Sequence, residues 1–126
     1  MAAVRATSDY KDLLVWQKGV ALVKQVYRIS RQFPPDERFG LAIQVRRAAV
    51  SIPSNIAEGQ ARHTSKEFVL FLSHAEGSVA EVDTQLTLAM ELGFCSRSEL
   101  SDAFQLVLEL RRMLNSLRRK LLAREH

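Results

Sequence analysis

Apolar side chains recur at steps of three and four residues along most of the chain, which is the spacing of one face of an α-helix. Four such segments follow one another, at about residues 11–32, 35–62, 65–92 and 97–122. None shows the two-residue alternation of a half-buried strand. The pattern predicts an all-α protein in a single domain, residues 1–126, folded as an antiparallel up-down-up-down four-helix bundle.

One apolar stripe on each segment is the predicted core. The four stripes are Leu13, Trp16, Val20, Val23 and Tyr27; Leu41, Val45, Ala48, Ala49, Ile52 and Ile56; Phe68, Phe71, Leu72, Ala75, Val79, Val82, Leu86 and Ala89; and Leu100, Ala103, Val107, Leu110, Leu114, Leu117 and Leu121.

Residues with cap chemistry mark the predicted helix ends. Pro35 suits a first helical turn, Thr64 with Glu67 suits a capping box, and Gly93 suits a C-terminal cap. Either Ser96 with Glu99 or Ser98 alone can begin the fourth helix.

The second helix contains a proline, Pro53, which removes one backbone donor and predicts a kink at that turn. On a helical wheel Arg47, Ser51, Asn55 and Glu58 share one polar stripe. The antiparallel arrangement would place Arg47 opposite Glu76 and Glu81 of the third helix. We therefore expect either an Arg47 ion pair with Glu81 or Glu76, extended by Ser51 and Asn55, or merely a solvated polar face.

The third helix carries a glycine, Gly77, between small residues. We expect Gly77 to allow a close approach of the second helix, near Ala48, Ala49 and Ser51.

A second apolar face lies on the second helix, away from the core stripe. Ile43, Val50 and Ala57 are spaced by seven residues, and Pro53 lies beside them. A helix that is apolar on two faces must bury both, whereas the bundle needs only one. We therefore expect these four residues to form a homo-oligomer interface.

The net charge of +4 is concentrated near the C-terminus. Residues 1–108 carry equal numbers of acidic and basic side chains. Beyond them, six basic residues face two acidic ones. The candidate phosphate-binding ladder consists of Arg111, Arg112, Arg118, Arg119 and Lys120. Arginine suits phosphate because its planar fork gives bidentate hydrogen bonds. The alternative is that cations near a helix C-terminus only complement the helix dipole and aid solubility.

Three runs of the sequence resemble a known family. They are DLLVWQKGVALVKQVY, FPPDERFGLAIQVRRAAVSIPSNIAEGQAR and SKEFVLFLSHAEGSVAEVDTQLTLAMELGF, within about residues 9–94. They are similar to the four-helix bundle proteins encoded in 23S ribosomal RNA intervening sequences, above all in SIPSNIAEG at residues 51–59. The resemblance implies a ring-shaped homo-oligomer, a pentamer. It also implies a relation in fold to the accessory variability proteins of diversity-generating retroelements, which are thought to bind nucleic acid and a reverse transcriptase.

Catalytic, metal and cofactor motifs are not found. No Glu-x-x-His pair is present, since the residues three before His63, His74 and His126 are Gln60, Phe71 and Ala123. The histidines have no ligand partners at zinc spacing, and the glycines form no phosphate-binding loop. A single cysteine, Cys95, excludes an intrachain disulfide. With no apolar run long enough for a membrane span and no signal-peptide pattern, we expect a cytoplasmic protein that does not contact membranes.

Two functions of different classes follow from these features. The first is a homo-oligomeric module that binds RNA or DNA through the basic ladder, by shape and backbone charge. The second is an oligomeric scaffold that binds a protein partner and no nucleic acid. Enzyme activity is not expected, because no nucleophile lies next to a base.

Overall fold

A computed structural model describes residues 9–124 of the chain. Within them lie four long helices, α2 (Leu14–Ser30), α3 (Leu41–Gln60), α4 (Ser65–Glu91) and α5 (Arg97–Arg124), and two short 3-10 turns, η1 (Tyr10–Asp12) and η2 (Pro35–Glu37). The described residues form no strand, so the all-α prediction is confirmed.

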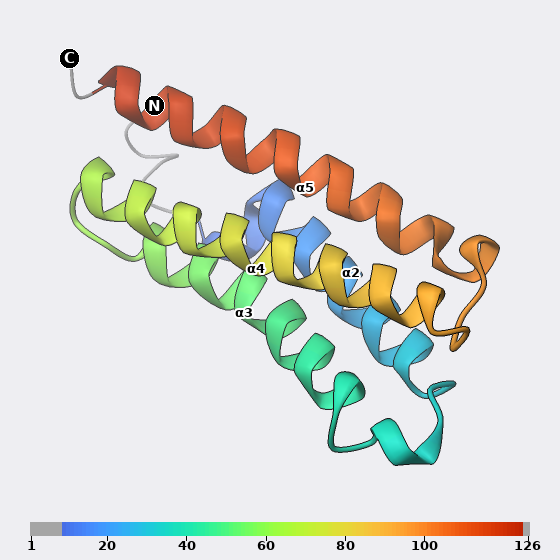
Figure 1. Cartoon of the computed structure of the whole chain (residues 1–126). Helices are drawn as coiled ribbons and strands as arrows, with labels where there is room; N and C mark the ends of the chain where they lie inside the picture. Colours follow the sequence, from blue (N-terminus) through green and yellow to red (C-terminus); the bar gives the residue numbers. More distant parts are fainter. Residues whose placement is uncertain (1–8, 125–126) are drawn as a thin grey trace.

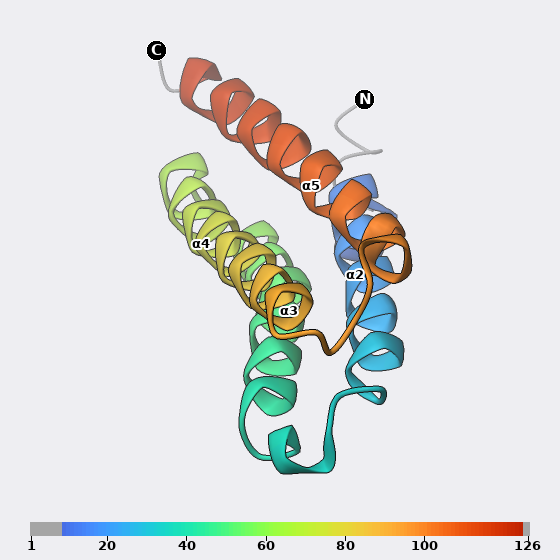
Figure 2. The ribbon, with the colours of Figure 1, turned by 45° about the vertical axis from the view of Figure 1, so that its right-hand side comes forward.

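The helices form a bundle in which each packs on the next and α5 returns to α2. Figure 1 shows the α3–α4 connection at one end and the other two connections at the opposite end, so the chain reverses direction at each connection. The second view keeps α5 beside both α2 and α4 (Figure 2). Neighbouring helices around the bundle are therefore α2 and α3, α3 and α4, α4 and α5, and α5 and α2.

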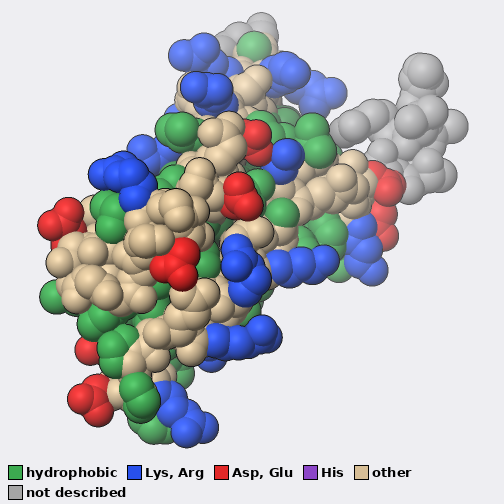
Figure 3. All heavy atoms as spheres, turned by 90° about the vertical axis from the view of Figure 1, so that its right-hand side faces the viewer, with side chains coloured by type: hydrophobic (Ala, Val, Ile, Leu, Met, Phe, Trp, Pro, Cys, Tyr) green, Lys and Arg blue, Asp and Glu red, His purple; other side chains and the backbone are tan. Residues whose placement is uncertain are grey.

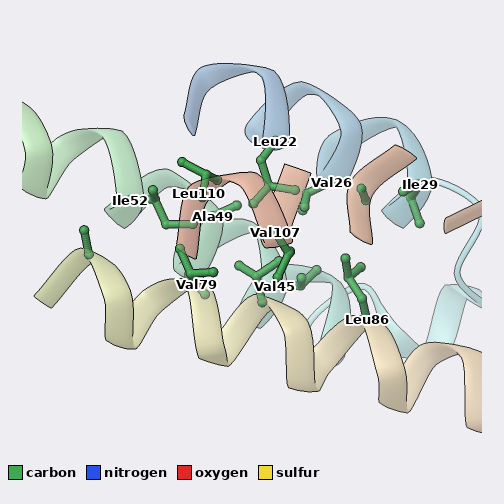
Figure 4. Packing of buried hydrophobic residues seen from close by; sticks show 14 of the residues in the cluster. Leu22, Val26, Ile29, Val45, Ala49, Ile52, Val79, Leu86, Val107 and Leu110 are labelled. Atoms are coloured by element: carbon green, nitrogen blue, oxygen red, sulfur yellow. The ribbon is translucent and has the colours of Figure 1, made fainter. Parts of the chain in front are cut away.

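The core lies between all four helices. Figure 4 shows Leu22 and Val26 of α2, Ala49 of α3, Val79 of α4 and Leu110 of α5 pointing toward a common centre. Nearly every residue of the stripes predicted for α3, α4 and α5 is buried or half-buried there. These three stripes are confirmed.

The stripe predicted for α2 is only partly confirmed, because Leu13, Trp16 and Val23 pack against the core from its edge and are not its fully buried residues. The buried residues of α2 are Val15, Gly19, Leu22, Val26, Ile29 and Ser30. Trp16, Val20 and Val23 lie half-buried on the neighbouring side, and Tyr27 is exposed. Both sets recur at three- and four-residue steps, because α2 is apolar on two sides. One side faces the core and the other lies beside α3.

Cap chemistry sets three of the helix ends. The Thr64 hydroxyl accepts a hydrogen bond from the Glu67 N–H at 3.1 Å and begins α4. Ser96 and Glu99 form a reciprocal box at the start of α5, with bonds of 2.8 and 3.1 Å. Gly93 follows α4 with a φ of 80°, a conformation in which a Cβ would be strained. All three caps were predicted.

The second long helix begins later than its apolar pattern predicts, at Leu41 instead of about residue 35. Pro35, Asp36 and Glu37 form the separate turn η2. The Glu37 carboxylate then accepts a hydrogen bond from the Leu41 N–H at 3.0 Å, which satisfies a donor in the first turn of α3. From there α3 continues through Pro53 to Gln60, and the kink at Pro53 stays a prediction.

Close helix approach occurs at other glycines than expected. Gly77 is exposed, and a Cβ there would meet nothing within 4 Å, so the expected close contact at Gly77 is wrong. A Cβ on Gly59 would lie 2.8 Å from Phe68 Cδ1 and from Phe71 Cβ. The tight crossing of α3 and α4 is therefore near their shared turn.

Candidate nucleic-acid interface

The basic ladder lies on the C-terminal half of α5. Arg111, Arg112, Arg119 and Lys120 are exposed and Arg118 is half-buried. Figure 3 shows several Lys and Arg side chains gathered at the upper end of the molecule, where Figure 1 places this half of α5. Buried Leu110, Leu114 and Leu121 hold the opposite side of the helix on the core. The apolar anchor thus keeps the cationic side turned outward.

Two arginines of the ladder are already paired with carboxylates of α4. Arg111 Nη2 lies 3.0 Å from Asp83 Oδ2. Arg118 Nη1 lies 3.4 Å from Glu76 Oε1, and its Nη2 donates to Asn115 Oδ1 at 3.0 Å. Their guanidinium groups therefore tie α5 to α4, and their charges are partly neutralised.

The other three cations of the ladder have no such partner among residues 9–124. Arg112, Arg119 and Lys120 make no ion pair within 4 Å with any residue between 9 and 124. Arg112 and Arg119 are seven residues apart, which places them about 10.5 Å apart along the helix axis. We call Arg112, Arg119 and Lys120 the open cations. Within the described part of the chain, they are the cations of the predicted ladder that no carboxylate holds in an ion pair.

The expected ion pair of Arg47 with Glu76 or Glu81 does not form. Glu76 is bonded to Arg118 instead, and among the described residues Arg47 and Glu81 make no ion pair with any residue. The helices α3 and α4 do pack on each other, but the competing arginine comes from α5. Both Arg47 and Glu81 are exposed, as the solvated-face alternative expects.

A smaller polar network joins α3 to α4 instead. The Ser51 hydroxyl is hydrogen-bonded to the hydroxyl of buried Ser78 and lies 2.9 Å from the Ala48 carbonyl oxygen. The Asn55 side-chain amide donates to the Ser51 carbonyl at 2.8 Å. Glu58 pairs with Arg62, two residues beyond the end of α3, at 3.2 Å. Ser51 and Asn55 therefore fasten the turns around Pro53, and Ser78 is a participant that the sequence did not indicate.

The second apolar face of α3 is only partly covered in the protomer. Val50 is 41% exposed, while Ile43 and Ala57 are half-buried. Pro53 is buried, because it packs on α2, where a Cβ at Gly19 would lie 3.4 Å from Pro53 Cδ. Pro53 therefore has little exposed surface, although it still lines the groove between α2 and α3, and its place in a subunit interface stays a prediction.

An apolar groove of about 310 Å³ runs between α2 and α3 over this face. Its lining residues are Tyr10, Trp16, Val20, Val23, Val50, Pro53, Ser54 and Ala57. We call it the α2–α3 groove. The half-buried residues Trp16, Val20 and Val23 of α2 thus form one apolar surface with the second apolar face of α3.

Two titratable groups depart from their ordinary behaviour. The hydrogen bond from Lys18, at 3.0 Å, lowers the pKa of Glu109, with a smaller contribution from Gln105. Burial raises the pKa of the Cys95 thiol, and the charge of Glu99 adds to the effect. Neither group lies beside a nucleophile and base pair.

The described side chains include no group of three or more His, Cys, Asp or Glu placed to hold a metal ion, and no described helix is long and apolar enough to cross a membrane.

Fold and surface together define a class, helical bundles with one cationic helix face and an unpartnered apolar groove. The chain matches the family described as 23S rRNA-intervening sequence protein over residues 11–116. It therefore belongs to that family. No curated protein matches the chain significantly.

The fold is also similar to a crystal structure of a protein of unknown function, from the S23 ribosomal protein family of Bacteroides thetaiotaomicron. The TM-score is 0.77 at 19% sequence identity, over 83% of this chain and 98% of the other. At this identity the similarity shows the fold alone.

Proposed function

We propose that this protein is a non-enzymatic, homo-oligomeric RNA-binding module of the cytoplasm, which contacts the phosphate backbone through the open cations Arg112, Arg119 and Lys120. The observation behind the proposal is that these three exposed side chains lie on one rigid helix without a carboxylate partner among the described residues. Arg111 and Arg118 serve chiefly to fix α5 on α4.

Backbone recognition suits this surface better than base recognition. Residues 111–124 of α5 contain no aromatic side chain on which a base could stack. Duplex RNA is recognised mostly by shape and by phosphate and 2′-hydroxyl contacts, for which two arginines on a stiff helix are appropriate. The family description refers to a sequence within 23S ribosomal RNA, which makes structured RNA the first ligand to test.

Assembly of several copies would strengthen an otherwise weak contact. The α2–α3 groove, with Val50 41% exposed at its rim, is the surface that we assign to the subunit interface. A ring-shaped pentamer is the assembly that the sequence resemblance implies. Linked copies that engage one RNA bind with an avidity well above that of a single protomer.

The proposal is tested with nuclease-treated protein and an RNA hairpin labelled for fluorescence anisotropy. Replacing Arg112, Arg119 and Lys120 together with Gln should weaken binding at least tenfold and leave the helical circular-dichroism spectrum unchanged. The matched control is a variant with Gln at three other exposed cations, in the C-terminal half of α2 and at its C-cap. These are Lys24, Arg28 and Arg31. Because the two variants lose the same charge, equal weakening in both would refute a local phosphate site.

An oligomeric protein scaffold without nucleic-acid binding is the alternative class. Its signature would be hairpin RNA failing to bind the wild type at low salt, together with a protein partner that is retained after nuclease treatment.

A further inference from the structure

A second groove lies where the first turn of α2 meets α5. Figures 1 and 2 both place the start of α2 beside the middle of α5. The groove has a volume of about 470 Å³, and its lining residues are Leu13, Leu14, Val15, Arg112, Met113, Ser116, Leu117 and Lys120. Leu14 is 58% exposed at its edge. We call it the α2–α5 groove, and its floor is apolar enough to hold two or three side chains of a ligand.

Two cations, Arg112 and Lys120, line this groove. Arg112 and Lys120 are eight residues apart on α5, and about 12 Å apart along its axis. Met113 and Leu117 lie between them. Three carboxylates lie nearby. Glu109 bonds to Lys18 at 3.0 Å and also interacts with Arg112 through its charge, and the Asp9 and Asp12 side chains accept hydrogen bonds from backbone N–H groups of η1 and its cap. The groove therefore combines an apolar floor with two cations and no acidic residue in its lining, although Glu109 partly offsets the charge of Arg112.

The start of α2 adds to the same potential. Leu13, the N-cap residue, has no side-chain hydrogen bond to the first turn, and that turn contains no acidic residue. The first N–H groups of a helix are unsatisfied within the helix, and its N-terminal end carries partial positive charge. An acidic ligand in the groove would thus meet positive charge from α2 as well as from α5.

We propose that the α2–α5 groove docks an amphipathic acidic helix of another protein, with two carboxylates about two turns apart on either side of an apolar patch. Two helical turns span about 11 Å, which matches the spacing of Arg112 and Lys120. A single-chain fatty acid has one carboxylate and would leave one cation unmatched. A phosphate chain would engage the cations but leave the apolar floor open to water.

This docking site goes beyond the RNA-binding function proposed above, although Arg112 and Lys120 belong to both surfaces. Two residues, Leu14 and Arg119, each belong to only one of the two proposed binding surfaces. Leu14 lines the α2–α5 groove and carries no charge for phosphate, whereas Arg119 is an open cation that does not line the groove. Variants at these two residues therefore distinguish failure of one proposal from failure of the other.

The test uses a synthetic amphipathic helix with a Leu stripe and two Glu residues seven positions apart, labelled for fluorescence anisotropy. We expect saturable binding to the full-length protein, weakened at least tenfold by Leu14→Glu or Lys120→Glu. The controls Leu108→Glu and Arg119→Glu, at exposed α5 positions outside the groove, should bind the peptide as the wild type does. A glutamate at position 14 begins a helix, where negative charge is favourable, so the fold should be retained.

Three results would overturn the proposal. The first is no saturable binding of the peptide up to about 1 mM, a concentration at which even a weak specific complex forms. The second is equal binding by the Leu14→Glu variant or by a peptide with Lys in place of Glu. The third is Leu14-dependent binding to vesicles of anionic phospholipid without binding to the peptide, which would assign the surface to a membrane.

Discussion

Arg111 Nη2 on α5 lies 3.0 Å from Asp83 Oδ2 on α4, so an arginine that the sequence offers to phosphate is held by a carboxylate of the same protomer. The same holds for Arg118, which lies 3.4 Å from Glu76. In the proposed RNA-binding surface, Asp83 and Glu76 of α4 therefore leave only the open cations for phosphate. Removing one of these carboxylates should enlarge that surface.

Asp83→Asn should raise the affinity for RNA, because Arg111 becomes free to contact phosphate. For a single strand the log–log salt slope should become steeper by about 0.7, the value for one added phosphate contact. The matched control is Glu91→Gln, which removes an acidic charge from the exposed end of α4 where the described residues supply no ion-pair partner. If Glu91→Gln raises affinity equally, the effect is one of net charge and Arg111 is not the cause.

Two glycines of neighbouring helices should respond to alanine in opposite directions. Gly59→Ala should destabilise the fold by about 1–3 kcal/mol, because its Cβ would collide with Phe68 and Phe71. Gly77→Ala should stabilise it by about 0.5–1 kcal/mol, since Gly77 is exposed within α4 and its Cβ would meet nothing. Urea unfolding at one protein concentration measures both. Equal changes in the two variants would contradict the packing described at the α3–α4 turn.

Val50→Asp should prevent the proposed assembly, because it places a charge on the α2–α3 groove without entering the core. Light scattering should then report the mass of a single chain, with the helical spectrum retained. Leu88→Asp is the control, since Leu88 is similarly exposed, at 46% against 41% for Val50, but lies on α4 away from the groove. Unchanged assembly in Val50→Asp would remove the α2–α3 groove as the interface, and loss of assembly only in Leu88→Asp would move the interface to α4.

Cys95 should make the stability fall at alkaline pH. Its thiol pKa is raised in the folded state, mainly by burial. The unfolded chain therefore releases the thiol proton first, from about pH 8.5. The contribution of Cys95 to the free energy of unfolding is therefore fully present below that pH, and it is lost as the pH rises above it. Urea unfolding between about pH 7 and 10 should show a steeper loss for the wild type than for Cys95→Ala. Parallel curves would mean that the thiol is not linked to folding.

Periodicity predicted the number of helices and most of the core, but it could not assign the phase of α2. Leu13, Trp16 and Val20 fit a helical stripe as well as Val15, Leu22 and Val26 do, because α2 is apolar on both sides. Which side faces inward depends on the packing of α3 and α5, which the sequence of α2 does not contain.

Local chemistry was more predictable than pairing across helices. The cap at Thr64 and the box at Ser96 involve residues three apart, so the sequence alone identifies both partners. The partners of Arg111 and Glu76 lie on a different helix, and the sequence analysis paired Glu76 with Arg47, whereas its partner is Arg118. Only the rotation of α5 against α4 decides between them. The close contact at Gly59 and the open site at Gly77 are decided in the same way, by which turns of two helices cross.

The most direct test of the RNA-binding proposal is the salt dependence of binding to a single-stranded RNA of about eight nucleotides, within the length that one binding site covers. If Arg112, Arg119 and Lys120 each neutralise one phosphate, the log of the association constant should fall against the log of the salt concentration with a slope of about −2. Replacing all three with Gln should bring that slope close to zero. An unchanged slope in this variant, or binding by the wild type that does not depend on salt, would contradict the proposal that the open cations of α5 bind RNA.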